Sequence, residues 1–557
     1  MIGTKGKWGV LLVALVLIAL GLTLAACGSS TTTTTASPAE SPKAGGTFTY
    51  GETADPGGLA PWAVYETVGW NLSYQCFEGL VTYALQPDGA MKTVPSIAES
   101  WSSPDGKVWT FKLKKGVMFG PPVSREAKAQ DFVASWNFNS DKSLGTNYTV
   151  FVFAPIVGTD DSGFRTGATL TGVKAVDDYT LEVTLKKPFY DFPVTTGHPI
   201  MWVEPVDYIK QVTVKAYAQK PVGGTGPYTI QKWAPDKYVT LVKNPSWWQA
   251  SSGTGPYLDT ITLKRYGNEN SEWLDFQKGT IDWTRVPPGQ VAAAENNPKV
   301  KDGTWSAKKW PAYAIEYTNI NMKDPLLGGA NGLPLRQALA YSTDTTPIVN
   351  VVREGVPLPA TGYVPAGIPG SGLAGVPYPY DLNKAKALVA QIGTVPTLNY
   401  WDQTNSETAT KVAEALQAGW KQAGINVKLT FYEWNKLNDM QRSAAAGDQI
   451  GRSGWSADYP LQDDFLYPMF YSTQMGLNAY SFYSNPKFDA LIDQARATAD
   501  ETQRQNLYAQ AEKLVLTDAV VIPTYFFRDF RVWNSTRMGG LVWSPMAYWD
   551  LWKAWVK

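Results

Sequence analysis

Nucleophilic and metal-binding chemistry is limited in this chain by its supply of histidine and cysteine. The 557 residues include one histidine, His198, and two cysteines, Cys27 and Cys76. A histidine-rich zinc site needs several such ligands, and a cysteine–histidine nucleophile pair needs one of each in contact. Cys76 lies among apolar residues and is predicted to be a buried, unreactive side chain. We therefore expect no catalytic residue, no metal site and no cofactor.

Carboxylates are the remaining groups that could do acid–base work. Asp463 and Asp464 are adjacent in sequence, but adjacent acids are common on surface loops. A glycosidase needs two carboxyl groups that face each other about 5–10 Å apart, and sequence does not give that separation.

One run of glycines matches a nucleotide-binding pattern. Gly370-Ser371-Gly372-Leu373-Ala374-Gly375 has the spacing G-x-G-x-x-G. That motif requires a strand before it and a helix that opens on it, whereas here Pro369 precedes it and VPYPY follows. We predict a loop. The phosphate-binding loop, the zinc-protease motif and the nucleophile elbow are absent from the sequence, which favours binding over catalysis.

The beginning of the chain has the order of an export signal. Lys5 and Lys7 precede an apolar run that ends in Leu24-Ala25-Ala26-Cys27. Small residues directly before a cysteine are typical of bacterial lipoproteins, so we predict that residues 1–26 are removed and that Cys27 carries lipid. The alternative is a single-pass membrane anchor, for which the run is short compared with the roughly 20 residues of a span.

Composition indicates a folded, exported protein with little net charge. Residues 27–46 are rich in Ser, Thr and Pro and predict a flexible tether. The chain has 49 basic and 49 acidic side chains, and the predicted signal contains two of the basic ones, Lys5 and Lys7. Basic and acidic side chains therefore nearly balance, and we expect no positively charged surface that would attract nucleic acid. With Cys27 lipidated, Cys76 has no partner for an intramolecular disulfide.

Two apolar periodicities divide the rest of the chain. Alternating residues predict strands in the first half, at 47–50, 108–119, 179–188, 238–245 and 257–266. Apolar residues spaced by three and four predict helices in the second half, at 333–344, 381–393, 408–424, 486–500 and 501–519, with strands at 425–434 and 520–527 between them. The fold class is therefore mixed α/β.

Several segments, taken in order, resemble one known family. They are YQCFEGLVTY (74–83), VPSIAESWSSPDGKVWTFKLKKGVMF (94–119), AQDFVASW (129–136), GVKAVDDYTLEVTLKKP (172–188), GGTGPYTIQKWAPDKYVTLVKNPSWW (223–248), LPLRQALAYSTDTTPIVNVVREGVPLPATGYVP (333–365), RSGWSADYP (452–460) and NPKFDALIDQARATADETQRQNLYAQAEKLVLTDAVVIP (485–523). Together they resemble the solute-binding proteins of ABC peptide importers, family 5, the oligopeptide/dipeptide class. The resemblance covers nearly the whole chain after the tether.

The resemblance implies a periplasmic-binding-protein-like α/β fold of class II (cluster C), with two main lobes, an additional α/β lobe and a hinged cleft. Lobe I would be discontinuous and the other two lobes continuous. The expected boundaries are 47–80, 191–286 and 523–557 for lobe I, 81–190 for the additional lobe, and 287–522 for lobe II. Crossing segments near 283–290 and 519–526 would form the hinge.

The segment RSGWSADYP carries the implied ligand contacts. A peptide removed from water needs an anion for its α-ammonium and a cation for its α-carboxylate, because an unpaired buried charge costs several kcal/mol. The resemblance assigns the first role to Asp458 and the second to Arg452, whose guanidinium suits a carboxylate. The alternatives are a turn cap for Asp458 and a structural ion pair for Arg452.

Four further residues are weaker candidates for the ligand pocket. Trp455 and Trp434 would form its walls, or else belong to the core. Tyr525, at the hinge, and His198 could also line it. Leu461-Gln462-Asp463-Asp464 follows the Asp-Tyr-Pro sequence where many relatives have an acid–proline pair, which leaves the preferred length of the ligand open.

The implied function is a receptor, not an enzyme. It would act as a monomer, held by lipid at Cys27 on the extracytoplasmic face of the bacterial cell membrane, and would pass peptides to the permease subunits of an ABC importer. One alternative keeps the fold and binds oligosaccharides or another small solute such as a metal chelate, since 23 tryptophans would suit sugars. A remote alternative is a secreted glycoside hydrolase or peptidase.

Overall fold

A computed structural model gives the structure of the protein. It describes residues 41–64, 66–146, 149–329, 331–404 and 406–557. The predicted signal, Cys27 and most of the predicted tether lie outside these residues. Residues 42–557 form one compact unit. Among the described helices there is none with the length and apolar character needed to cross a membrane.

A mixed sheet of eleven strands organises this unit. The strands are β1 (Thr47–Glu52), β8 (Tyr228–Ala234), β9 (Tyr238–Lys243), β10 (Thr260–Arg265), β11 (Trp283–Arg285), β12 (Trp305–Ile320), β13 (Leu358–Pro359), β14 (Leu398–Gln403), β15 (Val427–Tyr432), β16 (Ile450–Ser456) and β17 (Val521–Asn534). Their order is β15-β14-β16-β12-β17-β11-β1-β10-β9-β8, with β13 beside β17. The alternating strands predicted from the sequence are confirmed in this sheet, at β1, β9, β10, β15 and β17.

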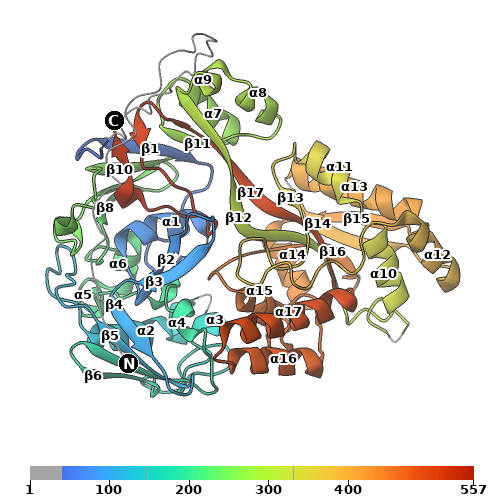
Figure 1. The fold of residues 1–557 in the computed structure, drawn as a ribbon, viewed down its shortest axis with the longest axis horizontal. Helices are drawn as coiled ribbons and strands as arrows, with labels where there is room; N and C mark the ends of the chain where they lie inside the picture. The colour runs from blue at the N-terminus through green and yellow to red at the C-terminus, as the bar shows by residue number, and fades with distance from the viewer. Residues whose placement is uncertain (1–40, 65, 147–148, 330, 405) are drawn as a thin grey trace, which may run out of the picture. The chain divides into compact units, whose positions relative to one another are not determined.

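Two long strands, β12 and β17, join the two parts of the sheet. They pair antiparallel from Trp305 with Asn534 to Asn319 with Val521. In Figure 1 they run together from the strands around β1 and β10 to the strands β14–β16. Their register shifts between Pro311 and Ile315, which is the point where β16 begins to pair with β12 on the other side.

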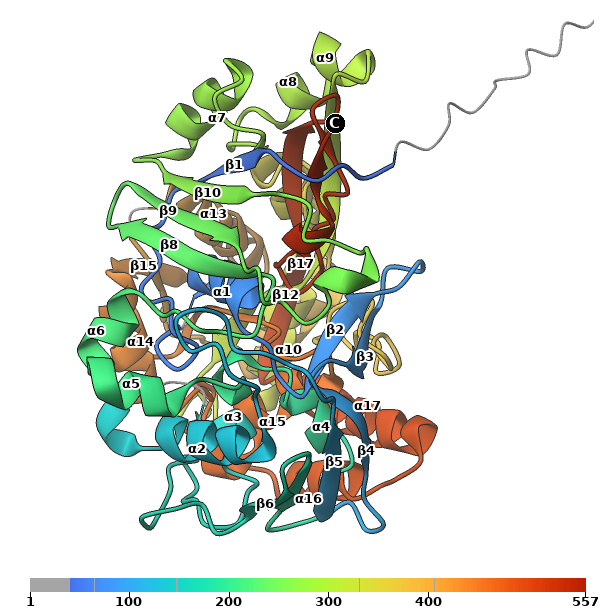
Figure 2. The ribbon, with the colours of Figure 1, turned by 90° about the vertical axis from the view of Figure 1, so that its left-hand side faces the viewer.

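Residues 81–190 form a smaller antiparallel layer. Figure 2 shows its strands below the large sheet, next to α2. Four strands pair in the order β4-β5-β7-β6, beside a β2–β3 hairpin. The bounds are β2 (Val81–Leu85), β3 (Met91–Pro95), β4 (Ala98–Ser102), β5 (Val108–Leu113), α2 (Ala129–Asn139), α3 (Thr149–Val152), β6 (Val173–Asp177) and β7 (Thr180–Thr184).

Helices dominate the second half. Five of them were predicted by the three- and four-residue spacing: α10 (Leu333–Tyr341), α12 (Leu382–Ile392), α13 (Glu407–Gln422), α16 (Pro486–Arg496) and α17 (Glu501–Thr517). Three others were not predicted: α11 (Thr345–Pro347), α14 (Trp434–Arg442) and α15 (Gln462–Phe470). The Asp381 carboxylate accepts a hydrogen bond from the Lys384 amide and so caps α12, and Gly393 ends that helix with a φ of 85°. The glycine run at 370–375 is a loop, as predicted.

The remaining α-helices lie before β12. They are α1 (Thr67–Cys76), α4 (Phe192–Thr195), α5 (Val206–Val212), α6 (Val214–Gln219), α7 (Glu269–Gln277), α8 (Val291–Glu295) and α9 (Pro298–Lys301), and the short pair β18 (Met538–Gly539) and β19 (Trp555–Val556) lies near the end of the chain. Cys76 is buried, as predicted.

The packing bears on where the two main lobes divide, although the lobe boundaries themselves stay a prediction. Residues of α7, α8 and the start of β12 share one apolar cluster, which includes Trp273, Val291 and Trp305. The segment after residue 287 therefore packs with the preceding helix as far as the first part of β12. This places the crossing between the two parts of the sheet within β12, beyond the predicted 283–290.

Candidate functional site

The end of β16 presents an unpaired backbone edge. Along its length β16 pairs with β12, but it pairs with β14 only at Ile450 and Gly451. The Ala457 amide donates to the Tyr313 carbonyl in the same register. Because alternate residues of an antiparallel strand point their N–H and C=O groups to opposite sides, those of Gly454 and Ser456 point away from β12. Both residues are exposed.

Two cavities lie along this edge. The larger, which we call the Trp455 cavity, has a volume of about 580 Å³ and is lined by residues 452–455, by α3 and by α14. The smaller, which we call the Ala457 cavity, has a volume of about 210 Å³ and is lined by Ser456 and Ala457 together with residues of α1 and β17. Residues 452–455 line the first cavity and residues 456–457 the second, so this one segment, the β16 wall, contributes to both.

Asp458 follows this wall directly and is deeply buried. Its residue surface is 5% exposed, and its buried Oδ2 has no hydrogen-bond partner. Burial raises the pKa of the Asp458 carboxyl well above its usual range. The turn-cap interpretation is not supported, since the described residues provide no backbone amide that donates to this side chain.

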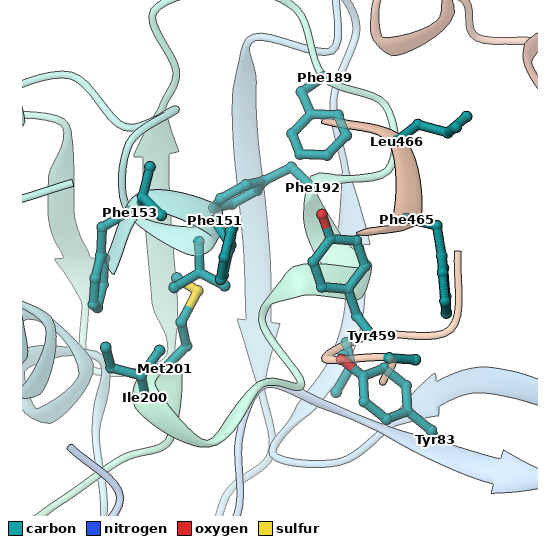
Figure 3. Close-up of a cluster of buried hydrophobic side chains, with 14 of the residues drawn as sticks. Tyr83, Phe151, Phe153, Phe189, Phe192, Ile200, Met201, Tyr459, Phe465 and Leu466 are labelled. Atoms are coloured by element: carbon teal, nitrogen blue, oxygen red, sulfur yellow. The ribbon is translucent and has the colours of Figure 1, made fainter. Parts of the chain in front are cut away.

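Asp463 and Asp464 differ from the sequence-based interpretation, which treated adjacent acids as typical of a surface loop. Both are fully buried in the first turn of α15. Figure 3 shows the apolar cluster around this turn, where Phe465 and Tyr459 lie beside Tyr83. Asp463 also accepts hydrogen bonds from Arg496 and Tyr508, 33 and 45 residues further along the chain, and a short window of sequence does not show such partners.

The two adjacent acids have different partners. Asp463 forms a bidentate ion pair with Arg496, at 2.7 and 2.8 Å. Asp464 Oδ2 accepts from the Asp458 amide at 2.9 Å and from Trp455 Nε1 at 3.4 Å, while its buried Oδ1 has no partner. Burial, and then the charge of Asp458, raise the pKa of Asp464 well above its usual range.

Arg452 is held by acids of the protein. Its Nε and Nη2 donate to the two oxygens of Glu316 at 2.6 and 2.8 Å, and Asp402 lies 3.9 Å from its Nε. This is the structural ion pair that the sequence analysis gave as the alternative. The arginine still lines the Trp455 cavity, so it contributes to the wall while its charge is balanced.

Trp455 and Trp434 both line the Trp455 cavity, as expected of pocket walls. Trp455 is half-buried and meets Phe151 of α3 edge to face, with ring centroids 5.8 Å apart. Trp434 is 49% exposed, and the Arg452 guanidinium lies 5.9 Å from the centre of its ring. Trp455 also packs against an apolar core cluster, so it belongs both to the cavity wall and to the edge of the core, whereas Trp434 is exposed at the wall.

Tyr525 and His198 lie away from both cavities. Tyr525 is 2% exposed and packs in the core beside Arg353. His198 is 1% exposed, accepts a hydrogen bond from the Ile200 amide and meets Trp70 edge to face. Burial lowers the pKa of His198 to about 3, so the ring is neutral. For these two residues the structure supports a packing role instead of ligand contact.

Arg442 is a candidate that the sequence analysis missed. It lines the Trp455 cavity, and its nearest carboxylate, Asp439, is 4.0 Å away and largely exposed. Among the described residues that line this cavity, none is a carboxylate. Arg442 is the last residue of the helix 434–442 that follows β15. A basic residue at that position usually stabilises the C-terminus of its helix, so its place in the sequence does not indicate a ligand contact.

Comparison with known proteins gives the family. The model of bacterial extracellular solute-binding proteins, family 5, matches residues 92–476. The periplasmic oligopeptide-binding protein OppA of Escherichia coli (strain K12) is 30% identical over 477 residues, which cover 83% of this chain and 83% of that protein. Heme-binding protein A of Haemophilus influenzae is 28% identical over 555 residues, which cover 96% of this chain and 97% of that protein.

Solved structures agree on the fold. The ABC transporter substrate-binding protein CtaP of Listeria monocytogenes has a TM-score of 0.77 at 24% identity, with 92% of this chain and 100% of that chain covered. The periplasmic binding protein DppA of Helicobacter pylori, in complex with the peptide STSA, has a TM-score of 0.75 at 24% identity, with 92% and 98% covered. The predicted periplasmic-binding-protein-like α/β class is confirmed, and the chain belongs to family 5 of the bacterial extracellular solute-binding proteins.

Proposed function

We propose that this protein captures oligopeptides outside the cytoplasmic membrane and delivers them to the permease of an ABC importer. Its family consists of extracellular solute-binding proteins, so a binding role outside the cytoplasm, without catalysis, holds at the level of the family. An oligopeptide is the ligand named for the Escherichia coli relative OppA. The observation that carries the proposal is the buried Asp458 carboxyl, which has no cation within the described part of the protein.

The backbone of the ligand would add to β16 as a further strand. The N–H and C=O groups of Gly454 and Ser456 are exposed on the free edge, and strand addition uses main-chain groups that every peptide possesses. Such pairing supports binding of many sequences. The α-ammonium would then contact Asp458, two residues beyond Ser456, and offset the free energy that burial of this carboxylate costs.

The carboxyl end of the ligand would lie in the Trp455 cavity. Two arginines line that cavity without any carboxylate in the described lining. Arg452 is balanced by Glu316. The carboxylate partner of Arg442 is Asp439, 4.0 Å away and exposed, and the Arg442 Nε otherwise donates to the neutral Leu477 carbonyl. We therefore propose Arg442 as the main anchor for the α-carboxylate and Arg452 as a weaker one. Trp455 and Trp434 would pack against the side chains of the ligand.

Calorimetry tests the proposal. We expect a pool of tri- to pentapeptides to bind the wild-type protein, and Asp458→Asn to weaken that binding about 100-fold, because one buried charge partner is lost. Asp161→Asn, which removes an exposed acid at a different cavity, is the matched control and should bind normally. Stabilisation by cello- or xylo-oligosaccharides with no response to peptides would instead support the sugar-binding alternative.

Membrane attachment is the second part of the proposal. Cys27 follows the predicted signal, and we propose that it carries the lipid that holds a monomer at the outer face of the membrane, beside its permease. Mass spectrometry of the mature N-terminus should show a diacylglyceryl or triacylated cysteine. Cys27→Ala should release the protein from the membrane fraction; continued attachment through an uncleaved segment would support the anchor alternative.

A further inference from the structure

The Trp455 cavity contains aromatic surface that the fold leaves uncovered. The rings that line it and stay partly or largely exposed are those of Phe164, Trp434, Trp455 and Tyr480. At 49%, Trp434 is the most exposed of the described tryptophans. Large apolar side chains that stay exposed in a concave site mark a place where a ligand packs. The uncovered rings therefore indicate an apolar ligand group in this cavity.

The cavity is large and is built by two separate parts of the chain. One part is α3 with the loop that follows it, which contributes Phe151 and Phe164. The other part includes α14, the end of β16 and the loop around Leu477, whose side chain is 38% exposed. Pockets of about 300–1,000 Å³ enclose drug-sized ligands. A volume of about 580 Å³ therefore has room for a bulky side chain as well as the end of a peptide backbone.

The charged side chains in the described lining of this cavity are both positive. They are Arg442 and Arg452, and neutral amide and hydroxyl groups supply the other polar atoms of that lining. Glu316 balances Arg452, and the Arg442 Nε donates to a neutral carbonyl. A ligand ammonium placed here would lose its water without gaining an anion from these walls, and like charges would face it. The cavity therefore disfavours a basic side chain.

The Ala457 cavity has a different charge pattern. It is smaller, at about 210 Å³, and its lining contains charges of both signs, from Glu52, Arg285, Asp529 and Arg531. Such walls offer a partner to a side chain of either charge. A choice between apolar and basic side chains is therefore expected at the Trp455 cavity and not at the Ala457 cavity.

Building on the proposed function, we propose that the Trp455 cavity selects peptides by their last residue, favouring phenylalanine, tyrosine or tryptophan and disfavouring lysine or arginine. The last residue is the one concerned because its side chain and its α-carboxylate leave the same Cα, and Arg442 shares the cavity with the exposed rings. An aromatic side chain buries about 150–250 Å² and packs favourably on other rings. This preference adds to pairing along β16, which treats all sequences alike.

Three tetrapeptides test this selectivity by calorimetry. Ala-Ala-Ala-Phe, Ala-Ala-Ala-Ala and Ala-Ala-Ala-Lys differ only in the last side chain. We expect the wild-type protein to bind the phenylalanine peptide about tenfold or more tightly than the alanine peptide, because of the apolar surface that the ring buries. The lysine peptide should bind no more tightly than the alanine peptide, because its ammonium finds no anion in the lining.

Variants assign the preference to this cavity. Trp434→Ala should reduce the preference for the phenylalanine peptide over the alanine peptide to about threefold or less, because the ring loses its largest exposed contact. Leu477→Ala, which shortens another exposed side chain of the lining, should also reduce it. Tyr380→Ala is the matched control and should keep the full preference, since Tyr380 is likewise 49% exposed but lines a different cavity.

The outcomes separate this inference from the proposed function. Equal binding of all three peptides by the wild-type protein would overturn the inference and leave the proposed function standing. A preference for the phenylalanine peptide that survives both Trp434→Ala and Leu477→Ala would do the same. No binding of any of the three peptides would overturn both.

Discussion

The two ends of the β16 wall differ in how their buried charges are balanced. At one end the Arg452 guanidinium meets Glu316 and Asp402. At the other end Asp458 and Asp464 have no cation in the described structure. A buried charge without a partner costs several kcal/mol. The first end is balanced by the protein itself, and the proposed ligand would supply the cation that the second end lacks. Charge balance is therefore what distinguishes the two ends of the wall.

The largest expected effect on stability comes from removing the cation at the balanced end of the wall. Arg452→Met leaves Glu316 and Asp402 buried without their cation, so we expect a loss of about 3–5 kcal/mol in the free energy of unfolding. Urea unfolding followed by tryptophan fluorescence measures it. The control is Arg442→Met, whose side chain is 48% exposed and whose loss should cost about 0.5 kcal/mol or less. If Arg452→Met unfolds like the wild type, the fold does not depend on that pair and the comparison fails.

At the unbalanced end, we expect a substitution to raise the free energy of unfolding instead of lowering it. Asp458→Asn removes a buried acid that has no partner, so the unliganded protein should gain about 1–2 kcal/mol of stability at pH 8. A carboxyl whose pKa is raised by folding stabilises the folded state at low pH and loses that contribution as pH rises through the raised value. In the unfolded chain the imidazole of His198, with an ordinary pKa of about 6.5, is largely neutral only above about pH 7.5, so the acids alone set the slope from there upward.

The pH dependence gives this prediction a second measurement. Burial also raises the pKa of Glu204 to about 8 and of Asp402 to about 7, so wild-type stability should fall between pH 6.5 and 8.5. Asp458→Asn removes one titrating group and should make the slope shallower by at most about 1.4 kcal/mol per pH unit. Loss of stability in the variant at every pH would mean that Asp458 has a structural partner.

Local sequence patterns predict local structure, but not contacts between distant parts of the chain. Alternation and three- and four-residue spacing predicted the clearest strands and helices, because each depends on the few residues around it, but they did not predict β12, β14 and β16. The burial of Asp458 was expected from its place in RSGWSADYP. The Glu316 partner of Arg452 lies 136 residues earlier in the chain, on a strand whose register is set by pairing across the sheet, and no local pattern specifies that register.

The same limit explains the residues that were misjudged. Asp463 and Asp464 were predicted to suit a surface loop, but they lie in the first turn of a buried helix. Arg496 and Tyr508, which donate to Asp463, come from distant segments of the chain. Tyr525 was expected to line the site because it lies in the crossing strand, yet its side chain faces the core cluster with Arg353. Which face of a crossing strand is buried depends on both of its neighbours, and these are fixed by the tertiary fold.

The smallest expected effect is on ligand binding by Arg442, which lies in the same cavity as the balanced Arg452. Because Arg452 is already paired, Arg442→Gln should weaken tetrapeptide binding about five- to tenfold, through loss of one partly exposed charge contact. The same peptide with an amidated C-terminus should bind both proteins alike, since it has no carboxylate to lose. Calorimetry with the two peptides separates a charge contact from a packing effect. If Arg442→Gln weakens both peptides equally, Arg442 only forms part of the cavity wall. The ligand carboxylate would then have to bind Arg452, in competition with Glu316.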